Sequence, residues 1–167
     1  AWDILPDLAK SYHPNPQSTF RLPATILFTT RGCPFRCLFC DRSVFGGKVR
    51  SHSAERVFRM MEHLHRHYGI VHFAFHDESL TFNEDRLAEL CERIIDSKLP
   101  LTWVCQGRVD QPLTRNTLHS MKRAGCKQLQ FGVETADGGL LDILQKGTSV
   151  EDIRRTLTVT RREGIST

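Results

Sequence analysis

Three cysteines lie close together in one short stretch of the chain, at Cys33, Cys37 and Cys40, with the spacing C-x3-C-x2-C. Thiolates are soft ligands, which favour zinc or iron–sulfur clusters over hard cations. Zinc sites and iron–sulfur cubanes usually take four protein ligands, and no fourth cysteine lies nearby. The fourth position is therefore filled by a distant residue or left for a ligand that is not protein. An iron with such an open position could take part in a reaction.

The other three cysteines, Cys91, Cys105 and Cys126, fall within helix-like or strand-like runs. This placement indicates buried thiols in a reducing compartment and not a disulfide framework. No apolar run reaches the roughly 18 residues of a membrane span, and no signal peptide is visible. We therefore expect a cytoplasmic protein.

Composition places the chain among ordinary globular domains. Its 167 residues can form one domain with its own core, and 40% of them are hydrophobic and 25% charged. The net charge of +4 permits an acidic substrate or a nucleic acid but argues for neither. We expect no nucleic-acid partner.

Apolar runs alternate with amphipathic runs along most of the chain. The apolar runs predict strands at about 24–30, 70–76, 101–106 and 128–133. The amphipathic runs predict one short helix near 138–146 and longer helices that begin after the N-cap residues Ser53, Asn83, Thr114 and Ser149. This alternation indicates parallel βαβ units with right-handed crossovers, as in a TIM-type barrel.

The number of these units predicts an incomplete barrel. Four β/α units can be recognised, and Ile165-Ser166-Thr167 resembles the start of a fifth strand. Residues 1–23 contain four prolines and little periodicity, so we expect a linker or an extended entry segment there. We therefore expect an α/β fold in which residues 24–167 form the N-terminal part of a TIM-type barrel, truncated after about four units.

Polar side chains are expected to gather at one rim of this sheet. Sites in parallel α/β folds lie at the carboxyl ends of the strands, and side chains alternate between the two faces of each strand. On each strand, the set of alternate residues that is apolar should lie under the helices. The other, polar set should face the barrel lumen. The residues that this parity places at the rim, close to the cysteines, are His76, Glu78, Gln106, Arg108, Gly132 and Glu134. A polar lumen indicates that a ligand occupies it.

Five stretches of the sequence together resemble one enzyme superfamily. They are TTRGCPFRCLFCDRSVFGGKVR, HDESLTFNEDRLAELCERI, WVCQGRVD, MKRAGCKQLQFGVET and ILQKGTSVEDIRR. In this order they resemble the radical S-adenosylmethionine (SAM) enzymes, and within them the domain found in the cobalamin-binding branch. The resemblance covers nearly the whole chain and implies a radical SAM barrel of six β/α units.

The resemblance implies a cofactor set and a reaction. Cys33, Cys37 and Cys40 would ligate a 4Fe-4S cluster whose fourth iron is chelated by SAM. One electron, from a donor such as flavodoxin or ferredoxin, would cleave SAM to a 5'-deoxyadenosyl radical that abstracts hydrogen from an unactivated C–H bond. In this branch a cobalamin-dependent methyl transfer or rearrangement would follow, with cobalamin bound by a domain outside this chain. The organic substrate is not identified by the sequence.

The resemblance also implies roles for Phe39 and for four of the rim residues. Phe39 matches the aromatic residue whose backbone lies near the SAM adenine. Glu78 would face the SAM ammonium, although the family has Gly-Gly-Glu where this chain has His-Asp-Glu. Arg108 would pair with the SAM carboxylate as a bidentate fork. Gln106 and Glu134 would bind the ribose hydroxyls or the ammonium.

Three alternative interpretations of these residues remain open. The cysteines could hold zinc, completed by Asp41 or His52, in a binding module without catalytic activity. Glu78, Arg108 and Glu134 could form a structural ion-pair network at the sheet edge. A tRNA methylthiotransferase-like enzyme would need the cysteines of a second cluster and an RNA-binding domain, and neither is visible.

Overall fold

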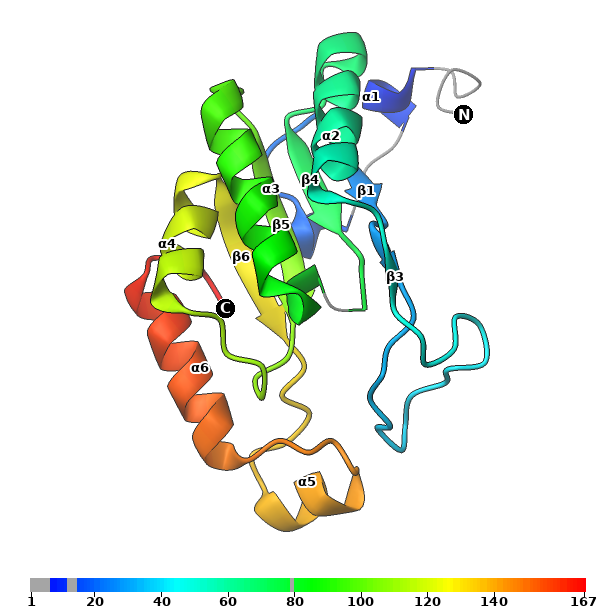
Figure 1. Ribbon diagram of the computed structural model, residues 1–167, viewed down its shortest axis with the longest axis vertical. Helices are drawn as coiled ribbons and strands as arrows, with labels where there is room; N and C mark the ends of the chain where they lie inside the picture. Colours follow the sequence, from blue (N-terminus) through cyan, green and yellow to red (C-terminus); the bar gives the residue numbers. More distant parts are fainter. Residues whose placement is uncertain (1–6, 12–14, 79) are drawn as a thin grey trace.

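The computed structural model describes residues 7–11, 15–78 and 80–167, and four parallel strands form its centre (Figure 1). These strands are β1 (Ala24–Leu27), β4 (His72–Phe75), β5 (Thr102–Gly107) and β6 (Cys126–Phe131). They lie in the order β1-β4-β5-β6, and each neighbouring pair is parallel. The predicted alternation of strands and helices in an α/β fold is confirmed.

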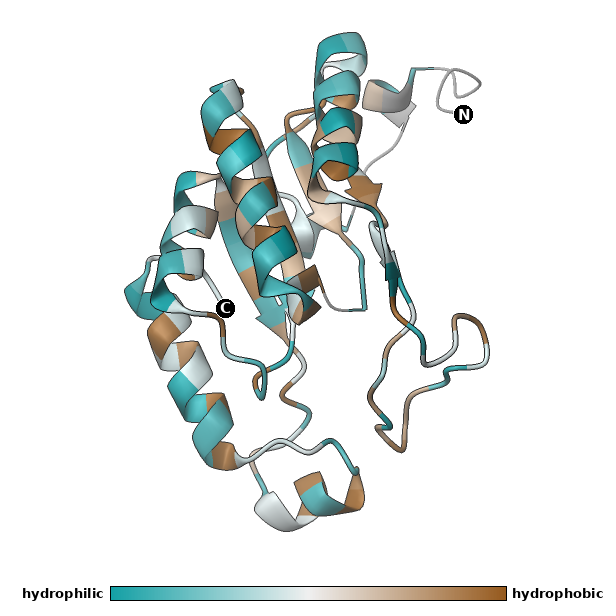
Figure 2. Ribbon diagram, in the orientation of Figure 1, coloured by the Kyte–Doolittle hydropathy of each residue, from teal (hydrophilic) through white to brown (hydrophobic). Residues whose placement is uncertain are grey.

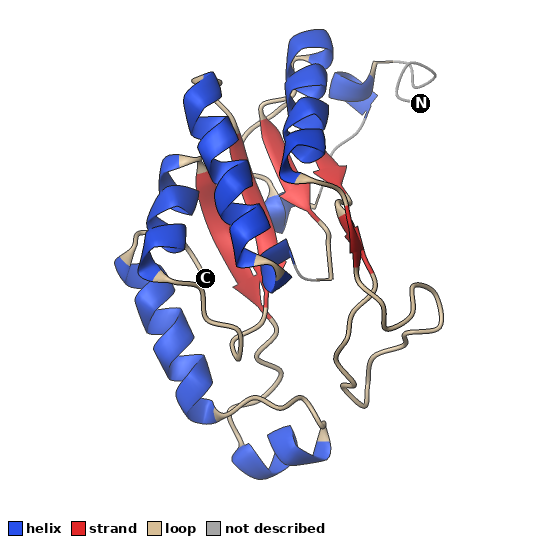
Figure 3. Ribbon diagram, in the orientation of Figure 1, coloured by secondary structure: helices blue, strands red, loops and turns tan. Residues whose placement is uncertain are grey.

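Helices cover one face of the sheet, as Figures 1 and 3 show for α2, α3 and α4. The main helices are α2 (Ala54–Tyr68), α3 (Glu84–Ser97), α4 (Arg115–Arg123) and α6 (Val150–Arg162). The short elements are α1 (Leu8–Ser11), α5 (Gly138–Ile143) and the 3-10 turns Pro16–Ser18 and Leu80–Phe82. Polar residues predominate on the outer faces of the helices in Figure 2, as expected for amphipathic helices. Among the described residues, no helix has both the length and the apolar character that a membrane crossing requires.

All four predicted N-caps are confirmed, because each side chain accepts a hydrogen bond from the backbone of the first helical turn. The capping side chains are those of Ser53, Asn83, Thr114 and Ser149. The predicted end of the short helix is wrong. It stops at Ile143, because Gln145 adopts a φ of 51°, which no α-helix can continue through.

The residues of apolar parity lie between the sheet and the helices, as predicted. Phe73, Phe75, Trp103 and Leu129 are all buried in one hydrophobic core. The Phe75 and Trp103 rings meet edge to face at 5.7 Å, and the Trp103 indole N–H donates to the Ala124 carbonyl at 2.9 Å. The core therefore holds the register of β4 and β5, and through it the rim at their carboxyl ends.

The first predicted strand, 24–30, is divided in the structure. β1 ends at Leu27, and Thr30–Arg31 form β2, which pairs antiparallel with β3 (Arg50–Ser51). Asp77 causes the break, since its carboxylate accepts hydrogen bonds from the backbone N–H of Thr29 at 2.5 Å and of Thr30 at 2.9 Å. The loop between β2 and β3, residues 32–49, carries the three clustered cysteines and is called the cysteine loop below.

The four-stranded sheet does not close into a barrel within the described residues. Ser166 forms a parallel bridge with Gln128 of β6, with hydrogen bonds on both sides. The segment predicted as the start of a fifth strand thus lies beside the fourth.

The segment predicted as a linker, 1–23, contains α1 and the first 3-10 turn among its described residues. Residues 1–6 and 12–14 of it lie outside the described part. The Ser18 carbonyl oxygen is 2.8 Å from Nε2 of His72, and Nδ1 of His72 is 2.8 Å from the Thr102 hydroxyl. His72 is fully buried, so this turn covers the amino end of the lumen face.

The buried His72 is expected to make the stability of the fold depend on pH. Burial lowers the pKa of its imidazole, against the opposing effect of the Ser18 hydrogen bond. The unfolded chain takes up a proton at this residue near pH 6.5, whereas the folded chain does so only at lower pH. The free energy of unfolding therefore falls as the pH decreases below about 6.5.

The variant His72→Gln tests this expectation. We expect it to be less stable than the unaltered protein at neutral pH, and the difference in Tm to narrow as the pH is lowered through about 6.5. Thermal unfolding by circular dichroism measures both. A difference in Tm that stays constant across this range contradicts the expectation.

Candidate functional site

A pocket of about 420 Å³ lies at the carboxyl ends of the parallel strands, beside the cysteine loop. The three clustered cysteines line it together with Phe39, Glu78, Gln106 and Arg108. The last predicted site residue, Glu134, is ion-paired with the pocket residue Lys146. The structure therefore brings the predicted residues of the cysteine loop and of three strand ends around one volume.

The cysteine loop is held in a hairpin by its own backbone. The Cys33 N–H donates to the Gly46 carbonyl at 3.2 Å, and the Cys40 N–H donates to the Cys37 carbonyl at 3.1 Å. Cys40 is exposed, whereas Cys33 and Cys37 are half-buried, and all three are free thiols. Their sulfur atoms are thus available to a ligand in the pocket.

Gly32 permits the close approach of the two arms of this hairpin. Its φ is +90°, and a Cβ at this position would lie 2.2 Å from the Lys48 carbonyl oxygen. No L-residue fits such a contact without moving the backbone that carries Cys33. Gly47 differs, because the nearest atom to its added Cβ is a flexible Arg42 nitrogen at 3.5 Å.

We expect Gly32→Ala to reduce metal binding by the loop, and Gly47→Ala to leave it near the level of the unaltered protein. The reason is that only the first change displaces the cysteine backbone. Iron per chain after anaerobic reconstitution measures the effect, and circular dichroism shows whether the helices are retained. Equal iron contents in the two variants would count against the role given to Gly32.

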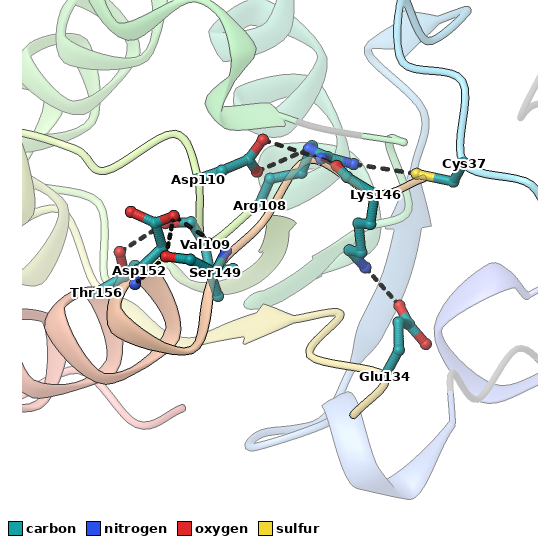
Figure 4. Close-up of polar contacts among 9 residues, drawn as sticks. All are labelled: Cys37, Arg108, Val109, Asp110, Glu134, Lys146, Ser149, Asp152 and Thr156. Carbon is teal, nitrogen blue, oxygen red and sulfur yellow. Dashed lines mark hydrogen bonds and ion pairs between the residues drawn. The ribbon is translucent and has the colours of Figure 1, made fainter. Parts of the chain in front are cut away.

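Arg108 connects the end of β5 to the cysteine loop (Figure 4). Its Nη1 lies 3.3 Å from Cys37 Sγ, and its Nε and Nη2 each lie 2.9 Å from a carboxylate oxygen of Asp110. Nη2 also donates to the Lys146 carbonyl at 2.5 Å. Burial opposes its positive charge, but the hydrogen bonds to Asp110 and Cys37 outweigh burial and raise its pKa.

The expected bidentate pairing of Arg108 with a SAM carboxylate is not the geometry that the structure contains. Asp110 occupies the Nε–Nη2 edge, and the Nη1–Nη2 edge is directed to Cys37 and the Lys146 carbonyl. Of the residues in the alternative ion-pair network, Arg108 and Glu134 do form ion pairs, but their partners are Asp110 and Lys146.

Lys146 brings a buried cation to the pocket. Its Nζ lies 2.6 Å from the Glu134 carboxylate and 5.7 Å from the centre of the Phe39 ring. The Lys146 side chain is 6% exposed, so little solvent screens its charge. Gly132 makes room for the pair, since a Cβ there would lie 2.6 Å from Glu134 Oε1 and 2.9 Å from Lys146 Nζ.

The remaining rim residues differ in position. Glu78 and Gln106 are exposed and line the pocket, with their side chains open to a ligand. His76 lies elsewhere, with its ring edge-on to Phe28 at 6.1 Å between the ring centres. The structure therefore places Glu78 and Gln106 at the pocket, as the parity predicts, but His76 is not among the residues that line it.

Comparison with known proteins decides the family. The model of the Radical SAM superfamily matches residues 27–167, which is most of the chain. This chain belongs to the radical SAM superfamily. The superfamily consists of enzymes, and its members use SAM and an iron–sulfur cluster.

The names of two relatives of this radical SAM chain describe different activities. An uncharacterized methyltransferase of Pyrococcus horikoshii is 32% identical over 145 residues, covering 86% of this chain and 31% of the relative. An anaerobic magnesium-protoporphyrin IX monomethyl ester cyclase of Synechocystis sp. is 28% identical over 98% of this chain and 32% of its own length. The chain thus spans about a third of the length of these relatives.

Two solved structures share the fold. The cobalamin-dependent SAM radical enzyme OxsB, with aqua-cobalamin and SAM bound, superposes with a TM-score of 0.79 at 23% identity, covering 86% of this chain and 23% of OxsB. The radical SAM methyltransferase TsrM from Kitasatospora setae gives 0.72 at 20% identity, covering 85% of this chain and 29% of TsrM. These matches confirm the predicted partial radical SAM barrel.

The three cysteines line one volume without converging on a single point. Within the part of the chain that the structure describes, no three His, Cys, Asp or Glu side chains converge to hold one metal ion. Asp41, one of the two candidates for a fourth zinc ligand beside His52, accepts hydrogen bonds from the Ser43 N–H at 2.8 Å and hydroxyl at 2.9 Å. In a cubane each thiolate binds a different iron, so the three thiols need only surround a common volume, as they do here.

Three residues that shape the surroundings of the pocket were missed in the sequence. Asp110 stands two positions after Arg108, and this short spacing could have indicated their pairing. Lys146 precedes Gly147 after a short helix, and no periodic pattern distinguishes it from a surface lysine. Asp77 adjoins Glu78 in the sequence, but only the fold shows that its carboxylate accepts a hydrogen bond from the backbone N–H of Thr29.

The cysteines outside the motif are buried, as predicted. Cys91, Cys105 and Cys126 are each no more than 1% exposed. Burial raises the pKa of the Cys91 thiol, and burial together with the Cys126 thiol raises that of Cys105. The protonated thiols of Cys91 and Cys105 are poor ligands and nucleophiles, and the thiols that line the pocket are those of the cysteine loop.

Proposed function

We propose that this chain binds a 4Fe-4S cluster and SAM in one pocket, as the radical-generating part of a cobalamin-dependent enzyme. The observation that carries the proposal is the gathering of three free, accessible thiols with the ends of three strands around about 420 Å³. Pockets that bind small molecules have volumes of roughly 300–1,000 Å³, so this volume suits a nucleoside-sized ligand.

Cys33, Cys37 and Cys40 would hold three irons of the cluster and leave the fourth facing the pocket. When bound and reduced, the cluster supplies the electron that cleaves SAM to methionine and a 5'-deoxyadenosyl radical. The contribution of the protein is to hold the two cofactors against each other and to exclude water.

Lys146 is the residue that we assign to the SAM carboxylate, in place of Arg108. Its buried ammonium lies at the pocket wall, where it is paired with Glu134. The SAM carboxylate could bind the same ammonium beside Glu134. Glu78 and Gln106 are assigned to the SAM ammonium and a ribose hydroxyl, since both side chains are exposed at strand ends. The exposed ring of Phe39 would lie beside the adenine.

The variant Lys146→Gln tests the assignment of the carboxylate. A charge-assisted contact to a buried cation is worth about 1.5–3 kcal/mol, so we expect the Kd for SAM to rise by roughly 10-fold to 100-fold. Lys127→Gln, which removes an exposed lysine of β6, is the matched control and should leave the Kd unchanged. Equilibrium dialysis of the reconstituted protein gives both values, and equal affinities would remove Lys146 from the site.

Cobalamin-dependent methyl transfer is the activity that we favour for the whole protein. Support comes from the methyltransferase of P. horikoshii at 32% identity and from the fold shared with OxsB and TsrM. A low-potential donor such as flavodoxin or ferredoxin would reduce the cluster, and an organic molecule would receive the methyl group.

The proposed reaction is tested with the anaerobic protein, dithionite and SAM. The expected products are 5'-deoxyadenosine and methionine, detected by liquid chromatography and mass spectrometry. Cobalamin that copurifies with the full-length protein would support the cobalamin-dependent branch. A full-length protein that binds iron but neither cobalamin nor SAM would overturn the proposal.

A further inference from the structure

Arg108 is directed at a cysteine that the proposed function assigns to the cluster. The Nη1 to Sγ distance of 3.3 Å to Cys37 is that of a hydrogen bond from a cation to sulfur. Arg108 is only 8% exposed, so this contact is screened little by water. The Cys37 sulfur stands for the thiolate that would bind iron.

The remainder of the guanidinium is fixed by three further contacts. Asp110 holds one edge with two bonds of 2.9 Å, and the Lys146 carbonyl accepts from Nη2. The face of the guanidinium lies 3.7 Å from the centre of the Phe35 ring, within the cysteine loop. Figure 4 shows Arg108 between Asp110 and Cys37. These contacts set the direction of Nη1, so its donation to Cys37 is preorganised and not incidental.

The segment that follows β5, directly after Arg108, is itself anchored. The Thr156 hydroxyl of α6 donates to the Val109 carbonyl at 2.7 Å, and Val109 is fully buried. The position of Arg108 is therefore maintained by the core, even though the cysteine loop is largely exposed.

Hydrogen bonds to sulfur and nearby charge are known determinants of the reduction potential of iron–sulfur clusters. Reduction by one electron adds negative charge to the cluster and its thiolates. A buried cation that donates to one of these thiolates stabilises the reduced form more than the oxidised form. Residues that orient ligands from outside the coordination sphere commonly have such effects.

We propose that Arg108 is a positioning residue that raises the reduction potential of the cluster through Cys37, with Asp110 and Phe35 fixing its orientation. The proposal rests on the proposed function, because it requires the cluster on Cys37. It also explains why the fork of Arg108 is turned to Asp110 and not to the open pocket.

The test is a redox titration of the reconstituted protein with mediators, followed by the electron paramagnetic resonance (EPR) signal of the reduced cluster. Arg108→Gln keeps a donor for Asp110 but removes the cation and its reach to Cys37, and we expect the midpoint potential to become more negative. Arg108→Lys, which retains the charge without the planar fork, should give a smaller shift. Arg42→Gln is the control, because it removes a cation of the cysteine loop. Among the contacts described, Arg42 touches no cysteine sulfur, so the midpoint potential should stay unchanged.

A second measurement needs no replacement of Arg108. Protein labelled with [15N]arginine and reduced should show a weak 15N hyperfine coupling to the cluster, which must persist in Arg42→Gln. Absence of this coupling, or a potential of Arg108→Gln equal to that of the unaltered protein, overturns the inference. A protein that forms no 4Fe-4S cluster at all overturns the proposed function instead, so the two failures can be told apart.

Discussion

Replacing Cys37 by alanine is expected to abolish cluster binding. The described residues offer no other thiol at the pocket to take its place, because the cysteines outside the motif are buried in the core. Loss of a direct ligand should cost more than the 10-fold to 100-fold that changes around a metal site typically cost. Iron and sulfide per chain, with the brown absorption of the cluster, measure the loss.

Cys33→Ala and Cys40→Ala should behave as Cys37→Ala does. The matched control is Cys91→Ala, which removes a thiol from the core of α3 and should retain full iron content. A Cys37→Ala protein that keeps its iron and its brown colour would show that the cysteine loop is not the cluster site.

Among the variants proposed here, Asp77→Ala is expected to lose the most folding stability. Its buried carboxylate accepts three hydrogen bonds, from the N–H groups of Thr29 and Thr30 and from the Thr29 hydroxyl. Arg86, largely buried, donates to the same Thr29 hydroxyl at 2.7 Å. Alanine would leave these donors without their acceptor and the Arg86 charge without a nearby anion. We expect this loss to lower the free energy of unfolding by about 3–5 kcal/mol. Domains of this kind have a total stability of about 5–15 kcal/mol.

Urea unfolding followed by circular dichroism measures this cost. Asp96→Ala is the matched control, since Asp96 is exposed at the end of α3, and it should change the free energy of unfolding by no more than about 0.5 kcal/mol. Asp77→Asn keeps the shape and one acceptor, so its loss should be intermediate. Similar unfolding curves for Asp77→Ala and Asp96→Ala would show that the carboxylate does not hold the segment between β1 and β2.

Local patterns in the sequence predicted most of the fold. Ser53, Asn83, Thr114 and Ser149 cap helices as predicted, because capping depends on residues within one helical turn. The alternation of apolar side chains also placed Phe73 and Trp103 under the helices. Both features are properties of short segments and can be recognised without the tertiary structure.

The features that could not be predicted depend on residues far apart in the chain. The first strand breaks after Leu27 because Asp77, some fifty residues later, accepts hydrogen bonds from the backbone that follows it. Lys146 enters the pocket because the segment after α5 returns to the end of β5, where its carbonyl meets Arg108. The pocket therefore contains the predicted residues, but the partners of Arg108 and Glu134 follow from tertiary contacts.

The central claim is that the three cysteines hold a cluster with one iron open to SAM. Low-temperature EPR of the anaerobically reconstituted, dithionite-reduced protein tests it most directly, with spectra recorded before and after SAM is added. The account predicts a 4Fe-4S signal that changes its shape when SAM binds. A protein that binds zinc and forms no cluster, or a cluster signal that SAM leaves unaltered, would contradict it.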